Sequence, residues 1–494
     1  MEKSSKLKVV GLTLAGLSVL VSGSALAASL KVGGAVQTDF AWFDDDVSHP
    51  NRVLGYGAGN LGFDNQSNVS SADVYLRGTL VDRWVYNLSV SHVMRDGRAG
   101  DDSAYLDQRR NGPYVLDAWV GWDRFDPWAR FSMGRMNVSQ GLENTGNRSA
   151  YTFIAPAAGQ RSFVVGRADG LTMEGNPTRW LGYQMGAYFH TTNAGAQGAA
   201  PGTAANIDTS SQVVVSNVGN HMGMYSARAF VQPWVLPGRV MHLGGSYSMV
   251  NTKGDVSLNA APGGYFNNSN AQLVRLSSAN GAALARNGVL KRTDGYDVWG
   301  FEGLGVWGPF HVQAEYTHFK LDLANAAKTD LVTNNAGAVT DELKANGWYV
   351  QGSWMLTGDT RHYDPVSGTL GKVKPRHAKW GAWELAGRYD KVNFAKTANV
   401  TGATSTATTF CGDLGSVGGA TGCTNGGKMT DWTLGLNWYA NSNVKLMANY
   451  TWAEGKYAEA AGDLGPNFGA RAHDRSNHSK RSVDVFAVKG QVDF

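Results

Sequence analysis

Apolar and polar side chains alternate through residues 482–494, and the same pattern recurs along the chain. Phe486, Val488, Gly490, Val492 and Phe494 share one face, whereas Lys489, Gln491 and Asp493 share the other. Strict alternation predicts a β-strand with one apolar and one polar face. Residues 29–43 alternate in the same way, and pairing of these two strands would leave no free sheet edge. The pattern therefore predicts a sheet that closes into a barrel.

The chain contains sixteen runs of this kind. They lie near 29–43, 70–80, 84–94, 113–123, 127–136, 163–175, 179–190, 222–234, 239–250, 295–306, 309–321, 346–357, 379–392, 429–440, 443–454 and 482–494. Each is long enough for a tilted transmembrane strand, which needs roughly 9–11 residues. Short and long connections alternate, except that 358–378 is a long connection on the short side. We therefore expect an all-β fold, a transmembrane antiparallel β-barrel with about 16 strands, short periplasmic turns and long extracellular loops.

Tryptophan placement favours the same fold. Nine tryptophans lie close to the short connections: Trp84, Trp122, Trp128, Trp180, Trp234, Trp307, Trp354, Trp380 and Trp438. Aromatic belts form at membrane–water interfaces because the indole ring is apolar while its N–H still requires a partner. The clustering predicts that the short connections lie at one membrane surface.

Strand parity divides the charged residues between the two faces of the wall. The inward basic residues are Lys31, Arg77, Arg130, Arg228, Arg388, Lys445 and Lys489, and the inward acids are Asp39, Asp73, Asp117, Glu315, Glu384, Asp390, Asp431 and Asp493. A cation facing lipid costs roughly 2–4 kcal/mol at the bilayer midplane, so these residues require water. Because sixteen strands enclose too wide a bore for side chains to fill, the sequence predicts a pore. The basic residues either guide ions or pair with neighbouring carboxylates, and the pattern leaves both interpretations open.

The first 28 residues have the features of a cleaved secretory signal peptide. A lysine-rich start precedes an apolar run at 9–21 and a small-x-small site at Ala25–Ala27. The apolar run is short for a membrane-anchoring helix. The expected organisation is a signal peptide at 1–28 and a barrel domain at 29–494. Removal of the signal peptide lowers the formal net charge from +4 to +2. A nearly neutral mature chain gives no reason to expect a nucleic-acid partner.

Cysteine and histidine placement bears on other chemistry. Cys411 and Cys423 bracket a glycine-rich segment and predict a loop disulfide in an exported protein, whereas a metal site would need more ligands than nearby Asp413. His242 and Ser246 share a strand face but lie some 13 Å apart, too far for a nucleophile and its base. We therefore expect no catalysis, no metal and no cofactor.

Several segments resemble the phosphate-selective porin family, the OprO/OprP-like outer-membrane porins. The similar stretches are GGAVQTDFAWFDDD (33–46), LDAWVGW (116–122), FSMGRMNVSQGLENTGNRSAYTFI (131–154), GWYVQGSWMLTGDTR (347–361), GKVKP (371–375), GAWELAGRYDKVNF (381–394) and DWTLGLNWYANSNVKLMANYTW (431–452). The resemblance implies a sixteen-stranded homotrimeric barrel in the outer membrane of a Gram-negative bacterium. It also implies a third loop that folds inward to narrow the channel. Here that constriction loop is about 137–162 and carries Glu143, Arg148 and Arg161.

The terminal Phe494 resembles the assembly signal of bacterial outer-membrane barrels, which implies the barrel-assembly machinery as a partner. Outer-membrane lipid and lipopolysaccharide would surround the wall. The leading hypothesis is a porin for passive diffusion of small hydrophilic solutes or ions, with a preference for anions or phosphate left open. The alternatives are a barrel-based receptor or adhesin, and a barrel enzyme without significant conductance.

Overall fold

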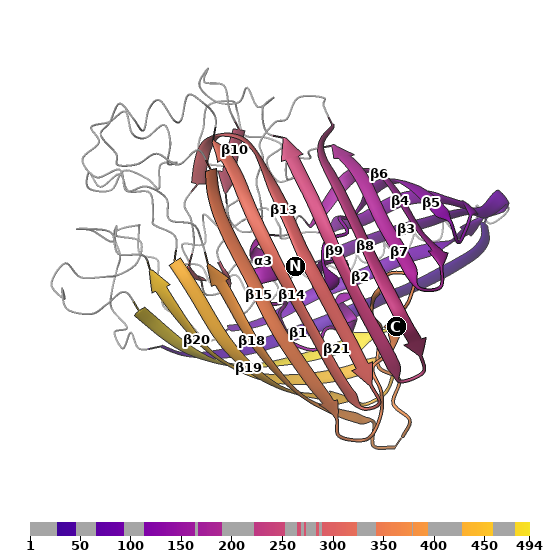
Figure 1. Cartoon of the computed structure of the whole chain (residues 1–494). Coiled ribbons are helices and arrows are strands. Elements are labelled where there is room, and N and C mark those ends of the chain that lie inside the picture. Colours follow the sequence, from indigo (N-terminus) through magenta and orange to yellow (C-terminus); the bar gives the residue numbers. More distant parts are fainter. Residues whose placement is uncertain are drawn as a thin grey trace, which may run out of the picture.

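Sixteen strands form a closed antiparallel barrel, as the sequence predicted. The computed structural model describes residues 27–45, 66–92, 113–163, 166–189, 222–251, 264–267, 271–272, 283–285, 289–323, 342–377, 379–393, 427–457 and 480–494. The barrel strands are β1 (Ala27–Asp45), β2 (Gln66–Leu80), β3 (Trp84–His92), β4 (Pro113–Phe125), β5 (Ala129–Asn137), β6 (Arg167–Thr178), β7 (Leu181–Phe189), β8 (Met222–Leu236), β9 (Arg239–Asn251), β13 (Val289–Trp307), β14 (Phe310–Leu323), β15 (Glu342–Met355), β18 (Ala382–Asn393), β19 (Gly427–Tyr439), β20 (Val444–Tyr457) and β21 (Lys480–Asp493). Each pairs with its neighbour in sequence (Figure 1).

The first and last strands close the barrel. In β1 and β21 the register places Val36 opposite Val492 and Phe40 opposite Val488. The terminal residue completes the seam, because the N–H of Gly34 donates to the carbonyl of Phe494 at 2.9 Å and the N–H of Phe494 donates back at 3.0 Å. The predicted pairing is therefore confirmed, and no edge of the wall is left open at this junction.

The wall is apolar outside and polar inside, the reverse of a soluble protein. On β19, Trp432 and Leu434 are 55% and 62% exposed, whereas Thr433 and Asn437 on the opposite face are at most 1% exposed. An alternation of period two produces this division because successive side chains of a strand point to opposite faces. The outward set meets lipid and the inward set meets the lumen.

Among the described helices, none is long and apolar enough to cross a membrane.

Aromatic side chains ring the outer surface at two levels. Near the short turns, Trp84 stacks on Trp122 with ring centroids 6.1 Å apart, and Trp383 stacks on Trp438 at 5.8 Å. This is the belt that the tryptophan positions predicted. A second set lies towards the opposite ends of the strands and includes Trp299, Tyr316, Trp348, Tyr389 and Trp432.

Three segments lie against the inner face of the wall. The inner loop, residues 138–166 between β5 and β6, contains α2 (Leu142–Thr145), η3 (Arg148–Ala150) and α3 (Ala158–Phe163). The 356–381 connection, between β15 and β18, contains a hairpin of β16 (Tyr363–Asp364) and β17 (Thr369–Leu370). Between β9 and β13, β11 (Ala271–Gln272) pairs with β12 (Ala283–Ala285), contacting α3 and the β19–β20 wall. A further short strand, β10 (Gly264–Asn267), extends the sheet beside β13.

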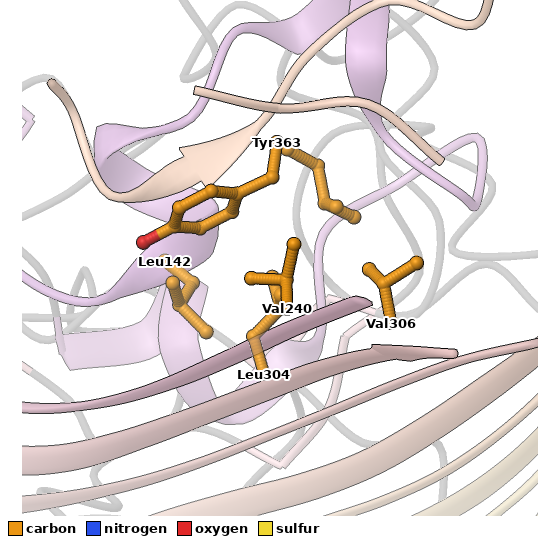
Figure 2. Packing of buried hydrophobic residues seen from close by; sticks show 6 residues of the cluster. Leu142, Val240, Leu304, Val306 and Tyr363 are labelled. Atoms are coloured by element: carbon orange, nitrogen blue, oxygen red, sulfur yellow. The ribbon is translucent and has the colours of Figure 1, made fainter. Parts of the chain in front are cut away.

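A small apolar cluster joins two of these segments to the wall. Figure 2 shows Leu142 of the inner loop and Tyr363 of the hairpin lying beside Val240, Leu304 and Val306 of β9 and β13, and Leu370 completes the cluster. These side chains face inward yet exclude water, because the inner loop and the hairpin cover them. The lumen is therefore partly filled, and its free bore is narrower than the bare barrel.

Of the predicted signal peptide at 1–28, residues 1–26 lie outside the described part of the chain, and Ala27 begins β1.

Candidate functional site

The inner loop begins with a short helix whose first turn is held by a wall carboxyl group. Glu315 of β14 accepts hydrogen bonds from the backbone N–H groups of Leu142 and Glu143, at 2.9 and 3.0 Å. The hydroxyl of Tyr349 donates to the same side chain at 2.5 Å. The first N–H groups of a helix have no partner within it, so an acceptor at this place satisfies them. The inward acid Glu315 thus ties the loop to the wall.

The last helix of the inner loop is held in the same way on another strand. Asp390 of β18 accepts hydrogen bonds from the backbone N–H groups of Ala158 and Gly159. The helix also lies directly on β15, where a Cβ at Gly159 would be 2.9 Å from the backbone nitrogen of Trp348 and 3.0 Å from Cα of Gly347. Only two glycines facing each other allow this approach.

Basic residues of the wall hold the middle of the loop through its carbonyl groups. Arg388 donates to the carbonyl of Ala155 at 2.9 Å, and its guanidinium lies 4.8 Å from the centroid of the Phe153 ring. Lys445 donates to the carbonyl of Tyr151. Both basic side chains are 4% exposed. These two predicted pore-lining residues therefore contact the loop rather than open water.

The hairpin of the 356–381 connection is held by a buried charge network. Arg228 of β8 pairs with Glu302 of β13 at 2.7 Å and donates to the carbonyls of Ser367 and Gly368. His242 lies between Glu302 and the hydroxyl of Tyr363, at 2.8 Å from each. Arg228 is 1% exposed, so the structure places it in a packed network.

The tip of the inner loop carries an exposed cation. Arg148 opens η3 and is exposed, and the ion pairs among the described residues do not include it. The next residue, Ser149, donates its hydroxyl to Asp493 of β21 at 3.0 Å. Burial raises the pKa of the nearby Tyr151 hydroxyl to about 12, so this hydroxyl stays protonated and donates to the carbonyl of Glu143.

The other predicted site residues fall into separate places. Lys31 and Arg77 are cross-strand neighbours on the inward face and are exposed, with Arg77 lying over the ring of Tyr75. Arg130 forms an ion pair with Glu174, and Lys489 lies 3.9 Å from Asp39. Glu143 is 7% exposed and accepts from the N–H of Ala157 at 2.7 Å. Arg161 belongs to α3, but its side chain lies outside the described residues, as do Cys411 and Cys423.

Most of the predicted inward acids are buried. Six of the eight are at most 5% exposed, namely Asp39, Glu315, Glu384, Asp390, Asp431 and Asp493. Asp73 and Asp117 are partly exposed, and Asp117 pairs with Arg167 at 2.8 Å. Lys31, Arg77 and Arg148 are exposed, whereas none of these eight acids is, so the exposed charges of this set are positive.

Sequence reasoning missed Arg361 and Lys372, which lie on the 356–381 connection. Arg361 is 3% exposed and pairs with Glu384, while Lys372 lies 3.0 Å from Asp493. The sequence contained one indication of their role, which is the length of this connection. A long connection on the short-turn side departs from the barrel pattern. In the described part of the chain, His, Cys, Asp and Glu form no cluster of three that could hold a metal ion.

Comparisons with known proteins show the family of this chain. Residues 34–470 match the family model of phosphate-selective porin O and P. Porin O of Pseudomonas aeruginosa is 27% identical over 440 residues, which cover 86% of this chain and 83% of that protein. Among solved structures, the anion-selective porin from Comamonas acidovorans has a TM-score of 0.45 at 12% identity, covering 94% of this chain and 99% of that one. The outer membrane channel DcaP of Acinetobacter baumannii has a TM-score of 0.46 at 8% identity, covering 95% and 98%. Because the family model matches most of its length, this chain belongs to the phosphate-selective porin O and P family, and it is an outer-membrane porin, a channel rather than an enzyme.

Proposed function

We propose that this porin prefers small anions and that the inner loop forms its constriction, with Arg148 and Arg161 facing the permeating solute. The observation that carries the proposal is the unequal exposure of the inward charges. The carboxyl groups are buried or take part in contacts with the wall and loop, whereas Lys31, Arg77 and Arg148 are exposed. A water-filled channel between low-dielectric walls concentrates the field of such cations on passing ions.

This proposal gives the seven basic wall residues two different roles. Arg228, Arg388 and Lys445 hold the hairpin and the inner loop, and Arg130 and Lys489 lie beside carboxylates. Lys31 and Arg77 remain as the cations that draw anions towards the constriction. Phosphate is one candidate solute, because guanidinium and ammonium groups both bind its oxygens.

We also infer a homotrimer, a cleaved signal at 1–28 and assembly through the strand that ends at Phe494. The family resemblance supports the trimer, and the hydrogen bonds between Phe494 and Gly34 support a role of the terminal strand in closing the barrel. Outer-membrane lipid and lipopolysaccharide are the expected surroundings of the apolar wall. The mass of the detergent-solubilised complex and the mature N-terminus test the first two inferences.

The test of selectivity is the reversal potential of the purified porin in a planar bilayer under a KCl gradient, repeated with potassium phosphate. The parent protein should show an anion-selective potential. Changing Arg148 and Arg161 to Glu should move this potential towards cations, most strongly at low salt, where screening is weakest. Arg239→Gln is the matched control, because Arg239 is exposed on the outer face over the ring of Trp307.

Strong cation preference in the parent protein would refute the anion assignment and leave the barrel intact. An unchanged potential in the double Glu variant would mean that the loop arginines do not line the conducting path. In that case selectivity would have to come from Lys31 and Arg77, whose neutralisation is the next measurement.

A further inference from the structure

The 356–381 connection reaches the inner loop through one buried arginine. Arg361 is 3% exposed, and its Nη2 donates to the carbonyl of Ala150. Its Nη1 donates to the hydroxyl of Tyr439 at 2.8 Å and lies 3.3 Å from Oε2 of Glu384. One guanidinium thus joins the connection, the β18–β19 wall and the inner loop.

The charge of this arginine is maintained where it lies. Burial on its own lowers the pKa of the guanidinium, but Glu384 and Tyr439 outweigh this effect and raise that pKa above its ordinary value. Glu384 also accepts from Ser353 at 2.7 Å and from Asn437 at 2.9 Å, so its position is fixed by the wall. Because the guanidinium of Arg361 is planar and Glu384 holds one side of it, the direction of its remaining N–H donors is fixed.

The carbonyl that Arg361 binds belongs to the turn that carries Arg148. The 3₁₀ turn η3 runs from Arg148 to Ala150. Arg361 therefore forms a hydrogen bond to the residue two positions after the exposed Arg148. Ser149 between them donates to Asp493, which also lies 3.0 Å from the ammonium of Lys372 on the same connection. Both residues that follow Arg148 are therefore held, one directly and one through Asp493, by the 356–381 connection.

We propose that Arg361 is a positioning residue for ion selection, and that it sets where the guanidinium of Arg148 stands in the lumen. The 356–381 connection is then part of the selectivity machinery and not merely a long turn. The inference rests on the proposed function of Arg148. It adds a residue that touches no permeating ion and acts through the backbone of the inner loop.

The test measures the position of residue 148 separately from its effect on ions. An Arg148→Cys thiol, in a Cys411→Ser/Cys423→Ser background, is labelled through the open pore with a charged methanethiosulfonate reagent. Adding Arg361→Gln should change the labelling rate at least about fivefold, since about 1 kcal/mol of lost docking gives a factor of this size. With native Arg148 present, Arg361→Gln should also move the reversal potential towards zero. Arg376→Gln, which alters an exposed arginine of the same connection, should change neither quantity.

Removing Arg361 alone leaves Glu384 buried without its cation, which can prevent folding. If the single variant does not fold, the same labelling and reversal-potential measurements are made on the double variant Arg361→Gln/Glu384→Gln, which removes both charges. A labelling rate within twofold of the parent in the folded variant would overturn the positioning role. If Arg148→Gln itself leaves the reversal potential unchanged, the selectivity proposal fails, while the labelling experiment still decides whether Arg361 positions the turn.

Discussion

Replacing Glu315 with alanine should release the start of the inner loop from the barrel wall. The side-chain oxygens of Glu315 hold the N–H groups of Leu142 and Glu143 at 2.9 and 3.0 Å, in a place where Glu315 is only 3% exposed. Each buried N–H without a partner costs about 1–3 kcal/mol, so losing the acceptor weakens docking of the loop by about 2–6 kcal/mol. Even ~2 kcal/mol raises the ratio of detached to docked loop about 30-fold, because every 1.4 kcal/mol is tenfold.

Trypsin cleavage after Arg148, followed by mass spectrometry of the barrel in lipid vesicles, measures the detached population. The rate should rise about 30-fold or more in Glu315→Ala, since cleavage follows the open population when opening and closing are fast. Single-channel records should show added current noise from the moving loop. Glu315→Gln should lie between, because an amide oxygen can still accept one of the two bonds.

The matched control is Thr317→Val, which keeps the shape of a buried side chain on the same inward face of β14. It should leave cleavage and noise at the parent level. If Glu315→Ala were cleaved no faster than Thr317→Val and conducted with the same noise, docking of the loop would not depend on these hydrogen bonds. The cap at Asp390 would then be the one to test.

Three further outcomes are expected. Glu302→Gln leaves Arg228 buried without its carboxylate and should lower the free energy of unfolding by about 3–5 kcal/mol, which denaturant titration of the folded barrel measures; an unchanged midpoint would contradict the pairing. Deleting Phe494 removes both hydrogen bonds to Gly34 at the seam and should reduce the heat-modifiable folded fraction on gels, whereas equal yields would show that the seam closes without it. Protein isolated from the envelope should contain a Cys411–Cys423 disulfide and no free thiols by mass spectrometry, and its reduction should leave the barrel folded because the strands hold one another.

The amino-acid sequence alone determined the barrel. Alternation of period two is a local property, so the pattern in residues 431–438 already assigns Trp432 and Leu434 to lipid and Thr433 to the lumen. Antiparallel neighbours joined by short turns need no long-range information, and all sixteen strands were found near their observed bounds. The closing pair was also predictable, because an unpaired first or last strand would leave a free edge.

Which inward charges stay free was decided only by the tertiary structure. Glu315 meets Leu142 across 173 positions in the chain, and Arg361 meets Ala150 across 211. Strand parity says that a side chain points inward, but it does not say whether water or a folded-in segment meets it there. The two sets of inward charges therefore looked similar in size in the sequence. They became unequal because the inner loop covers Glu315 and Asp390, and Arg361 of the 356–381 connection pairs with Glu384. Lys31, Arg77 and Arg148 are left exposed. The physical reason is that burial and hydrogen bonding depend on contacts between distant segments, whereas the period of a strand depends on the backbone alone.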